Sequence, residues 1–258
     1  MVGSVNPVKP YFETALPQVL AHRGLHTDVP ENTLEAFKRA IAAGATHVET
    51  DAHASADGVA VLVHDACIDV GGRKVVVAEC TAVELASLDL GFGEGIPSLE
   101  SVLLALPDAR FNIDVKVNAA VEPVARAIHS TGAFDRVLIA SFKAARRTRT
   151  LRSLQGVATS SSASVSFLAV ILATIGLTAI GQLFLRRIDA MQLPTTMISI
   201  PVFTPRFIRM CHQAGVLLHA WTINDPIHMT DLLHRGIDGI VTDRADLAAV
   251  VVAQLRVR

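Results

Sequence analysis

Residues 18–65 decide the fold of this chain, and they read QVLAHRGLHTDVPENTLEAFKRAIAAGATHVETDAHASADGVAVLVHD. The stretch begins with a short run of residues that favour a β-strand (18–22). It passes through a helical pattern of apolar residues (33–43) and returns to a second strand-type run (47–51). A strand, a helix and a strand in this order predict two parallel neighbouring strands joined by a helical crossover.

The same alternation continues through the rest of the chain. Strands are expected at 18–22, 47–51, 59–64, 111–116, 137–141, 157–160, 190–193, 217–222 and 239–243. Helices are expected at 33–43, 98–106, 120–130, 143–154, 205–214, 226–234 and 245–255. Because eight strand–helix units close into a barrel, the sequence predicts an α/β fold, an irregular TIM (β/α)8 barrel.

The ninth strand signal has its own explanation. The runs 47–54 and 59–64 are separated only by residues 55–58 (SADG), which are too few for a parallel crossover. We therefore expect these two runs to form a β-hairpin. The hairpin would carry His64 back beside the carboxylates of the preceding strand.

Local signals mark the ends of two of these helices. Asn32 is a favourable N-cap for the first, with Glu35 as its capping-box partner and Gly44 at its end. Asp225 followed by Pro226 is a typical start of a later helix.

Length and composition indicate one barrel domain over residues 1–258, with 51% hydrophobic residues to fill its core. The net charge is −1, and the basic residues are scattered apart from Arg146, Arg147, Arg149 and Arg152. Those four arginines are expected to form a solvated helix face. Without a basic stripe interleaved with aromatic residues, a nucleic-acid partner is excluded.

The three cysteines suit a reducing compartment, and the first 17 residues lack the apolar region of a signal peptide. A cytoplasmic location is therefore expected, with membrane association as the alternative. That alternative depends on residues 165–185 (VSFLAVILATIGLTAIGQLFL), which carry no charge over about the length of a bilayer span. We interpret the segment as an apolar barrel helix with its flanking turn, because a span here would cut the barrel in two and leave open sheet edges.

Groups suited to phosphodiester chemistry gather at the predicted strand ends, where barrel enzymes carry their catalytic residues. Glu49 and Asp51 lie two residues apart on one strand and so share a face, as do Asp114 and Lys116. Three carboxylates at one mouth favour a Mg²⁺ or Ca²⁺ site with oxygen ligands. The other polar or aromatic residues near these ends are His22, Arg23, His64, Ser141 and Trp221.

The motifs AHRG, PENT, ETD, VLVHD, FNIDVK, ASF, AWTIN and DGIVTDR occur in this order over residues 18–250. In this respect the chain resembles the glycerophosphodiester phosphodiesterase family, whose fold is similar to that of the phosphatidylinositol phospholipases. The resemblance implies an irregular barrel with a small insertion after the His-Asp strand, here residues 66–97.

The resemblance also assigns roles. It places the two catalytic histidines at His22 and His64, with Arg23 as a further catalytic and phosphate-facing cation. Lys116 and Trp221 would bind substrate. The metal ligands would be Glu49, Asp51 and Asp114. The family usually has glutamate where this chain has Asp114, so the third ligand and the choice between Mg²⁺ and Ca²⁺ stay open.

The expected reaction is metal-dependent hydrolysis of a small-molecule glycerophosphodiester to glycerol 3-phosphate and an alcohol. One histidine would take a proton from the nucleophile, and the other would protonate the leaving alkoxide. Two alternatives remain: a lysophospholipase-D-like activity on lipids, and a non-catalytic barrel that binds a metal or a headgroup. Two histidines beside the carboxylates argue against the second, because a binding module needs no proton transfer. The alcohol moiety and the oligomeric state are not readable from these residues.

Overall fold

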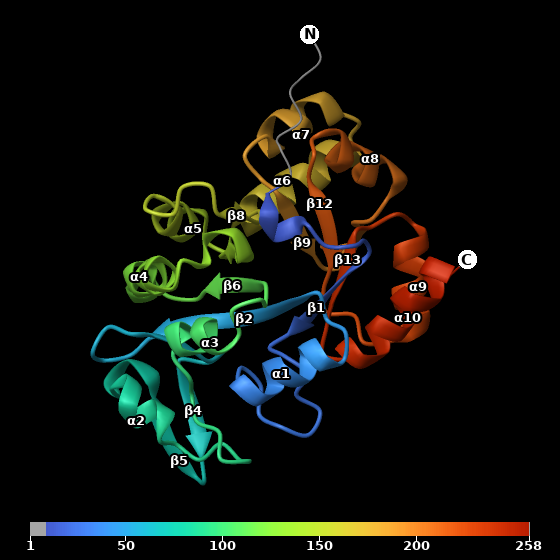
Figure 1. Ribbon diagram of the computed structural model, residues 1–258. Coiled ribbons are helices and arrows are strands. Elements are labelled where there is room, and N and C mark those ends of the chain that lie inside the picture. Colours follow the sequence, from blue (N-terminus) through green and yellow to red (C-terminus); the bar gives the residue numbers. More distant parts are fainter. Residues whose placement is uncertain (1–8, 258) are drawn as a thin grey trace.

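A barrel of eight parallel strands forms the centre of the computed structural model, which describes residues 9–257 (Figure 1). The strands are β1 (Gln18–His22), β2 (His47–Ala54), β6 (Phe111–Val115), β7 (Val137–Ala140), β8 (Ala158–Thr159), β9 (Ala190–Leu193), β12 (Leu217–Ala220) and β13 (Gly239–Thr242). Their order is β8-β7-β6-β2-β1-β13-β12-β9, and a parallel bridge between Ser160 and Ala190 closes the gap between β8 and β9. The predicted TIM-type barrel is confirmed.

The first and last strands of the barrel are neighbours. Gln18 of β1 pairs with Gly239 of β13, and His22 at the other end of β1 pairs with Glu49 of β2. Closure of the barrel therefore places the first strand, β1, beside the last strand, β13. Residues that follow these two strands come close together at the mouth of the barrel.

The predicted hairpin is present. β3 (Ala60–Leu62) runs antiparallel to the end of β2, with Ala52 paired to Leu62 and Ala54 to Ala60. The insertion follows at once: β4 (Cys67–Val70) pairs antiparallel with β5 (Arg73–Val76), and α2 (Ala82–Ala86) comes next. It packs beside the barrel on a small apolar cluster that it shares with Val61 and Val63 of the hairpin (lower left in Figure 1). The organisation of residues 1–258 as one domain stays a prediction.

Helices surround the strands, as the alternating pattern predicted. They are α1 (Leu34–Ala42), α3 (Leu99–Ala105), α4 (Val121–Thr131), α5 (Ala144–Leu151), α6 (Ala163–Thr174), α7 (Thr178–Leu185), α8 (Pro205–Gln213), α9 (Pro226–His234) and α10 (Ala245–Val257). Short 3-10 turns lie at η1 (Pro10–Phe12), η2 (Val77–Glu79), η3 (Asn118–Ala120) and η4 (Ala133–Arg136). The main core fills the space between the helices and the strands.

Of the two predicted helix starts, one is right and one is displaced by a residue. Asp225 caps α9 by accepting a hydrogen bond from the backbone of His228, at 2.8 Å. The N-cap of α1 is Thr33 and not Asn32: the Thr33 hydroxyl accepts from Ala36 N at 3.3 Å. Asn32 has a left-handed backbone (φ 58°) and sends its side chain into the barrel mouth instead.

The uncharged segment 165–185 contributes to two helices rather than one. α6 and α7 meet at a turn where Gly176 has φ +85°, a conformation that glycine adopts without strain. Among the residues that the structure describes, no helix combines the length and the apolar character needed to span a bilayer. A second difference from the prediction is a small hairpin after β9, formed by β10 (Thr196–Met197) and β11 (Ile200–Pro201).

Candidate active site

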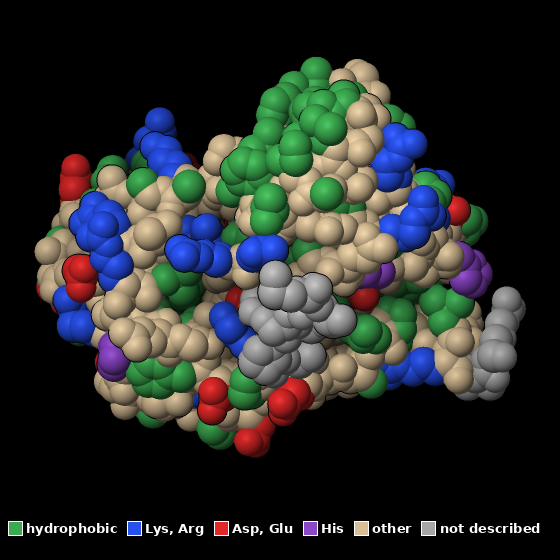
Figure 2. All heavy atoms as spheres, turned by 90° about the horizontal axis from the view of Figure 1, so that it is seen from above, with side chains coloured by type: hydrophobic (Ala, Val, Ile, Leu, Met, Phe, Trp, Pro, Cys, Tyr) green, Lys and Arg blue, Asp and Glu red, His purple; other side chains and the backbone are tan. Residues whose placement is uncertain are grey.

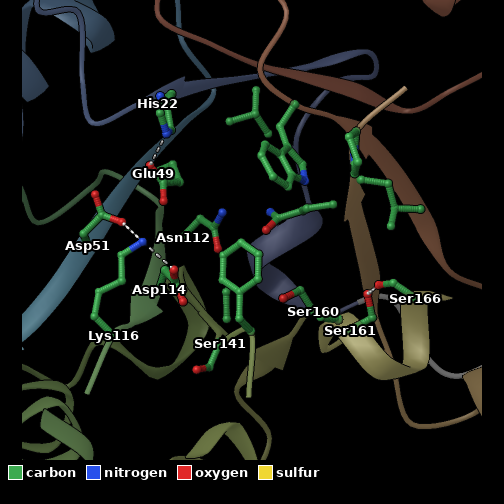
Figure 3. Close-up of a pocket in the computed structure, with 18 of the residues that line it drawn as sticks. His22, Glu49, Asp51, Asn112, Asp114, Lys116, Ser141, Ser160, Ser161 and Ser166 are labelled. Atoms are coloured by element: carbon green, nitrogen blue, oxygen red, sulfur yellow. Dashed lines mark hydrogen bonds and ion pairs between the residues drawn. The ribbon is translucent and has the colours of Figure 1, made fainter. Parts of the chain in front are cut away.

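A cavity of about 410 Å³ opens at the carboxyl ends of the barrel strands. Every residue predicted for the site lines it: His22, Arg23, Glu49, Asp51, His64, Asp114, Lys116 and Trp221. Figure 3 shows how the polar members converge from β1, β2 and β6. Predicted site residues that are up to 199 positions apart along the chain, from His22 to Trp221, therefore line one cavity.

His22 is held by a carboxylate that the sequence analysis missed. Its Nδ1 lies 2.6 Å from Asp243 Oδ1, and its Nε2 lies 4.0 Å from Glu49 Oε2. Hydrogen bonds from His22 and then His26 lower the pKa of Asp243, so this group is an ionised acceptor. Because an ionised carboxylate only accepts, Nδ1 of His22 carries the proton. Nε2 is then the nitrogen that faces the carboxylates of the cavity.

Asp243 directly follows β13, and the closed barrel sets β13 beside β1. Its second oxygen accepts a hydrogen bond from Asn224 Nδ2 at 2.7 Å. The signal that could have found it was present: Asp243 ends the DGIVTD motif, and in any closed barrel the residue after the last strand lies near the end of the first.

Arg23 is tied to acidic groups on two sides. Its Nη1 donates to both oxygens of Glu31 at 3.0 Å, and its Nε lies 3.1 Å from Asp51 Oδ2. Its backbone N–H donates to Glu49 Oε2 at 3.2 Å. Burial alone would lower the pKa of Arg23, but Asp51 and Glu31 together raise it. Arg23 therefore stays charged at the cavity wall.

Lys116 stands between two of the predicted metal ligands. Its Nζ lies 2.7 Å from Asp51 Oδ1 and 2.8 Å from Asp114 Oδ2 (Figure 3). Asn32 adds a hydrogen bond to Asp51 Oδ2, at 3.2 Å. Burial alone would raise the pKa of Asp51, but Lys116, Arg23 and Asn32 together lower it. Asp51 is thus an ionised carboxylate with cations or donors on both oxygens.

The carboxylate of Glu49 is in a different environment from that of Asp51. Burial raises the pKa of Glu49 well above its usual range, and the charges of Asp51 and Asp114 raise it further. Within the described residues, no three His, Cys, Asp or Glu side chains are arranged so that they could hold a metal ion. The predicted ligand set of Glu49, Asp51 and Asp114 lines one cavity, but the ammonium of Lys116 lies between two of its members.

Two buried oxygens at this place have no hydrogen-bond partner. They are Oδ1 of Asp114 and Oδ1 of Asn112, both on β6 and both at the cavity. A buried acceptor without a donor is costly, so oxygens of this kind indicate where a bound cation or substrate hydroxyl is accommodated. Sequence reasoning did not single out Asn112, although it lies two residues before Asp114 and so shares its face.

His64 lies at the rim of the cavity, on the loop that follows β3. Its side chain is about one third exposed, and its Nδ1 lies 2.9 Å from Asp65 Oδ1. The backbone carbonyl of His64 is held by His53 Nε2 at 3.1 Å. The hairpin therefore delivers a second imidazole to the mouth, with Asp65 as its partner.

Aromatic and hydroxyl groups form the far wall. Trp221 packs edge-on against Phe142, which is 59% exposed, with ring centroids 6.2 Å apart. Ser161 and Ser166 share a hydrogen bond of 2.7 Å, shown in Figure 3. Ser141 lies in the cavity wall and donates to Val115 O at 2.8 Å. Apart from Trp221 and Ser141, none of these residues was singled out from the sequence.

Two arginines of α5 do not belong to a solvated face. Arg146 donates to Val115 O at 2.9 Å, and Arg147 donates to Thr159 Oγ1 and Ser160 O at 3.0 Å. Both tie α5 to the barrel beside the cavity. Only Arg149 and Arg152, on the outer side of the same segment, are exposed as expected.

The comparisons with known proteins bear on this site directly. The model of the glycerophosphoryl diester phosphodiesterase family matches residues 22–247. This chain belongs to that family. The match begins at His22, within the first site motif, and ends after Asp243, so it takes in all the site residues named above.

Relatives of similar length support the assignment to the glycerophosphoryl diester phosphodiesterases. The chain is 42% identical to probable glycerophosphodiester phosphodiesterase 2 of Mycobacterium tuberculosis, with 88% of each chain covered. It is 30% identical to a glycerophosphodiester phosphodiesterase of Caldanaerobacter subterraneus, covering 87% of this chain and 93% of the relative. The predictions of the family and of an enzyme are confirmed.

Solved structures of such phosphodiesterases share the fold. One from Agrobacterium tumefaciens has a TM-score of 0.74 at 22% identity, covering 91% of this chain and 98% of its own. One from Oleispira antarctica, in complex with the product sn-glycerol-3-phosphate, has a TM-score of 0.73 at 22% identity, covering 92% and 97%. The barrel of this phosphodiesterase is thus the fold of its family.

Proposed function

We propose that the chain hydrolyses glycerophosphodiesters to glycerol 3-phosphate and an alcohol, with His22 and His64 transferring the protons and a divalent cation assisting. One observation carries the proposal: His22 is oriented by an ionised Asp243 at 2.6 Å, which leaves Nε2 free to exchange a proton beside a carboxylate-lined cavity. The product bound to the Oleispira antarctica enzyme, sn-glycerol-3-phosphate, has the chemistry that this reaction predicts.

The donor set fits a hard divalent cation. Glu49, Asp51 and Asp114 supply carboxylate oxygens at one end of the cavity, and Asp114 Oδ1 is buried without a partner. The three proposed ligands supply oxygen atoms only, which favours Mg²⁺ or Ca²⁺. Such a cation would polarise a phosphate oxygen when bound, and its charge would oppose the burial and the carboxylate repulsion that together raise the pKa of Glu49. Because Lys116 already bridges Asp51 and Asp114, it competes with a cation for the same oxygens.

The chain's own cations act on the phosphate. Arg23 and Lys116 line the cavity beside the carboxylates, and negative charge that grows on the phosphate oxygens is stabilised by positive groups already held in place. Burial alone would lower the pKa of Lys116, but Asp114 and Asp51 together raise it, so the side chain remains an ammonium. Lys116 therefore acts as a fixed charge rather than as a proton donor.

Proton transfer balances the reaction. In the net reaction a new P–O bond forms to the oxygen of water, whose proton goes to one histidine. The bond from phosphorus to the alcohol breaks, and the other histidine protonates the alkoxide. His22, at the end of β1, and His64, on the loop after β3, both line the cavity. Two imidazoles at one cavity suit a reaction in which one proton is taken up and another is donated.

A second candidate is favoured by the far wall of the cavity. Besides the serine hydroxyls, the cavity lining includes five apolar or aromatic side chains: Phe142, Leu193, Pro194, Met197 and Trp221. Such a lining accommodates an acyl chain, as a lysophospholipase-D-like activity would require.

Purified protein assayed on glycerophosphocholine and on lysophosphatidylcholine separates the two candidates. Release of glycerol 3-phosphate from the first compound supports the proposed reaction, and release of lysophosphatidic acid from the second supports the lipid activity. Loss of turnover with chelator, and its recovery with Mg²⁺ or Ca²⁺, tests the cation. Failure to cleave either phosphodiester in any metal would refute both candidates.

A further inference from the structure

Helices α6 and α7 are apolar on the side that faces solvent as well as on the side that faces the barrel. Residues 163–185 contain no charged side chain. On a surface helix of a globular protein the outward face is normally polar, and a helix that is apolar all round is normally covered. The exposed apolar residues of this pair, called here the apolar face, are Phe167, Leu168, Ile175, Leu177, Ile180, Leu183 and Phe184.

The apolar face is one continuous surface. α6 and α7 pack against each other, and both pack against α8. Phe167 and Leu168 are exposed on α6, and Ile175 follows its last residue. Leu177, at the start of α7, and Ile180 and Phe184 on it are spaced by three and four, so they lie in one stripe. Ile175 is 61% exposed and Leu183 55%. Figure 2 shows hydrophobic side chains gathered in this region, with Lys and Arg at the margins.

The charge of the chain is divided between two parts. Residues 136–224 contain ten Lys and Arg against a single acidic residue, Asp189, which gives this part a formal net charge of +9. Because the whole chain carries −1, the remaining residues carry −10. Asp189 is itself paired with Lys9 Nζ, at 2.7 Å. The positive part includes α5, α6, α7 and α8, in the upper half of Figure 1.

Basic side chains border the apolar face at both ends. Arg206 Nη1 donates to the carbonyls of Ala173 and Thr174, at 3.5 and 3.3 Å, which places this guanidinium beside Ile175. Arg209 is exposed one turn further along α8. At the other end, Arg187 is exposed three residues after Phe184. An apolar centre with arginines at its edges is the pattern of a surface that binds an anionic lipid interface.

The apolar face also borders the active-site cavity. α6 lines the cavity through Ala163 and Ser166, and the next residue, Phe167, belongs to the apolar face. Phe142, at the cavity wall, is exposed as well. A surface bound to the apolar face would therefore lie next to the cavity mouth.

We propose that the apolar face of α6 and α7 docks peripherally on a membrane that contains anionic lipid. The apolar side chains would enter the boundary between headgroups and acyl chains, and the arginines at the edges would pair with lipid phosphates. A second copy of this chain fits the face less well, because it would bring its own Arg187, Arg206 and Arg209 towards the arginines of the first copy. The proposal concerns binding and holds whichever phosphodiester the cavity cleaves.

Flotation of the purified chain with vesicles tests the docking. We expect binding to vesicles of phosphatidylglycerol and phosphatidylcholine, weaker binding at high salt, and little binding to pure phosphatidylcholine. Leu183→Ser with Phe184→Ser should lower the partition coefficient at least tenfold. Arg187→Gln and Arg209→Gln should each lower it about fivefold, the effect of one basic residue near an anionic surface. The control is Ile227→Ser on α9, a position 80% exposed but in the acidic part of the chain.

Turnover of a water-soluble glycerophosphodiester should stay unchanged in all these variants, which verifies that the barrel is folded. If wild-type protein fails to float with anionic vesicles, the docking proposal is wrong. Equal binding to neutral vesicles would overturn the role of the arginines, and an equal loss with Ile227→Ser would overturn the role of the apolar face. Light scattering that shows a dimer abolished by Leu183→Ser, without vesicle binding, would assign the face to self-association instead.

Discussion

Asparagine in place of Asp243 should disable His22 by reversing the proton arrangement of its ring. Asp243 accepts from His22 Nδ1 with one oxygen and from Asn224 Nδ2 with the other. The side-chain amide of Asn224 cannot flip, because its Oδ1 already accepts hydrogen bonds from Thr242 Oγ1 and from the backbone N–H of Asp243, both at 2.9 Å. An amide at 243 must therefore present its oxygen to Asn224 and its NH2 group to His22.

This arrangement makes Nδ1 of His22 an acceptor and moves its proton to Nε2, the nitrogen that faces the cavity. Loss of a hydrogen bond to a charged group costs about 1.5–3 kcal/mol, which alone lowers the rate about 10- to 100-fold. If proton transfer at Nε2 is lost as well, kcat should fall further, towards the decrease of about 10² to 10⁴ that is typical when a positioned acid or base is removed. KM should change little, because Asp243 does not line the cavity.

The assay is steady-state release of glycerol 3-phosphate from glycerophosphocholine by the purified variant. A second variant, Asp243→Asn combined with Asn224→Asp, provides the matched control. The carboxylate at 224 then accepts the new amide NH2 group, so the amide oxygen turns back to His22 and kcat should recover at least tenfold. The reasoning is refuted if the single variant keeps kcat within threefold of wild type, or if the double variant is no faster than the single one.

His22→Ala and His64→Ala should each lower kcat by about 10² to 10⁴, and near wild-type turnover in either folded variant would remove that histidine from the mechanism. Chelated enzyme should be inactive until Mg²⁺ or Ca²⁺ is added, and Asp114→Glu should keep the cation; full activity after exhaustive chelation would exclude a cation from the reaction. Acid should destabilise the fold, because burial lowers the pKa of His47 to about 4 and of His219 to about 3. Below about pH 6.5 the unfolded chain binds protons that these folded histidines do not, so the free energy of unfolding falls as pH falls, by about 1.4 kcal/mol per unit for each histidine. Urea unfolding at pH 7 and pH 5 measures this slope, and His47→Gln should reduce it; a slope unaffected by that change would contradict the assignment.

The charge division and the Asp243 contact illustrate two different limits of reading a sequence. The formal charge of +9 on residues 136–224 can be counted from the sequence. That this charge lies on one side of the molecule depends on the fold, which gathers α5 to α8 there. The contact between His22 and Asp243 joins residues 221 positions apart. The local motif marks Asp243 only as the residue after the last strand, and its contact with His22 follows from closure of the barrel, which sets β13 beside β1.

Patterns in the sequence predicted the barrel, the hairpin of β2 and β3, and the charged residues, histidines and tryptophan that line the cavity, whereas Asn112, Phe142, Ser161 and Ser166 were missed. The reason is that strand and helix periods are local, and that the carboxyl ends of parallel strands must meet at one mouth. Segment 165–185 and the start of α1 differ from the local prediction: a turn at Gly176 divides the apolar run into α6 and α7, and Asn32 hydrogen-bonds Asp51 while Thr33 caps α1.

The contacts that each of these side chains makes depend on the tertiary structure. Lys116 bridges Asp51 and Asp114, Asp243 orients His22, and Arg146 is tied to the barrel rather than solvated. Such contacts depend on the register between strands and on which partner satisfies each buried charge. A buried carboxylate takes the nearest donor that the fold supplies, and that donor comes from a distant part of the chain as readily as from a neighbouring residue.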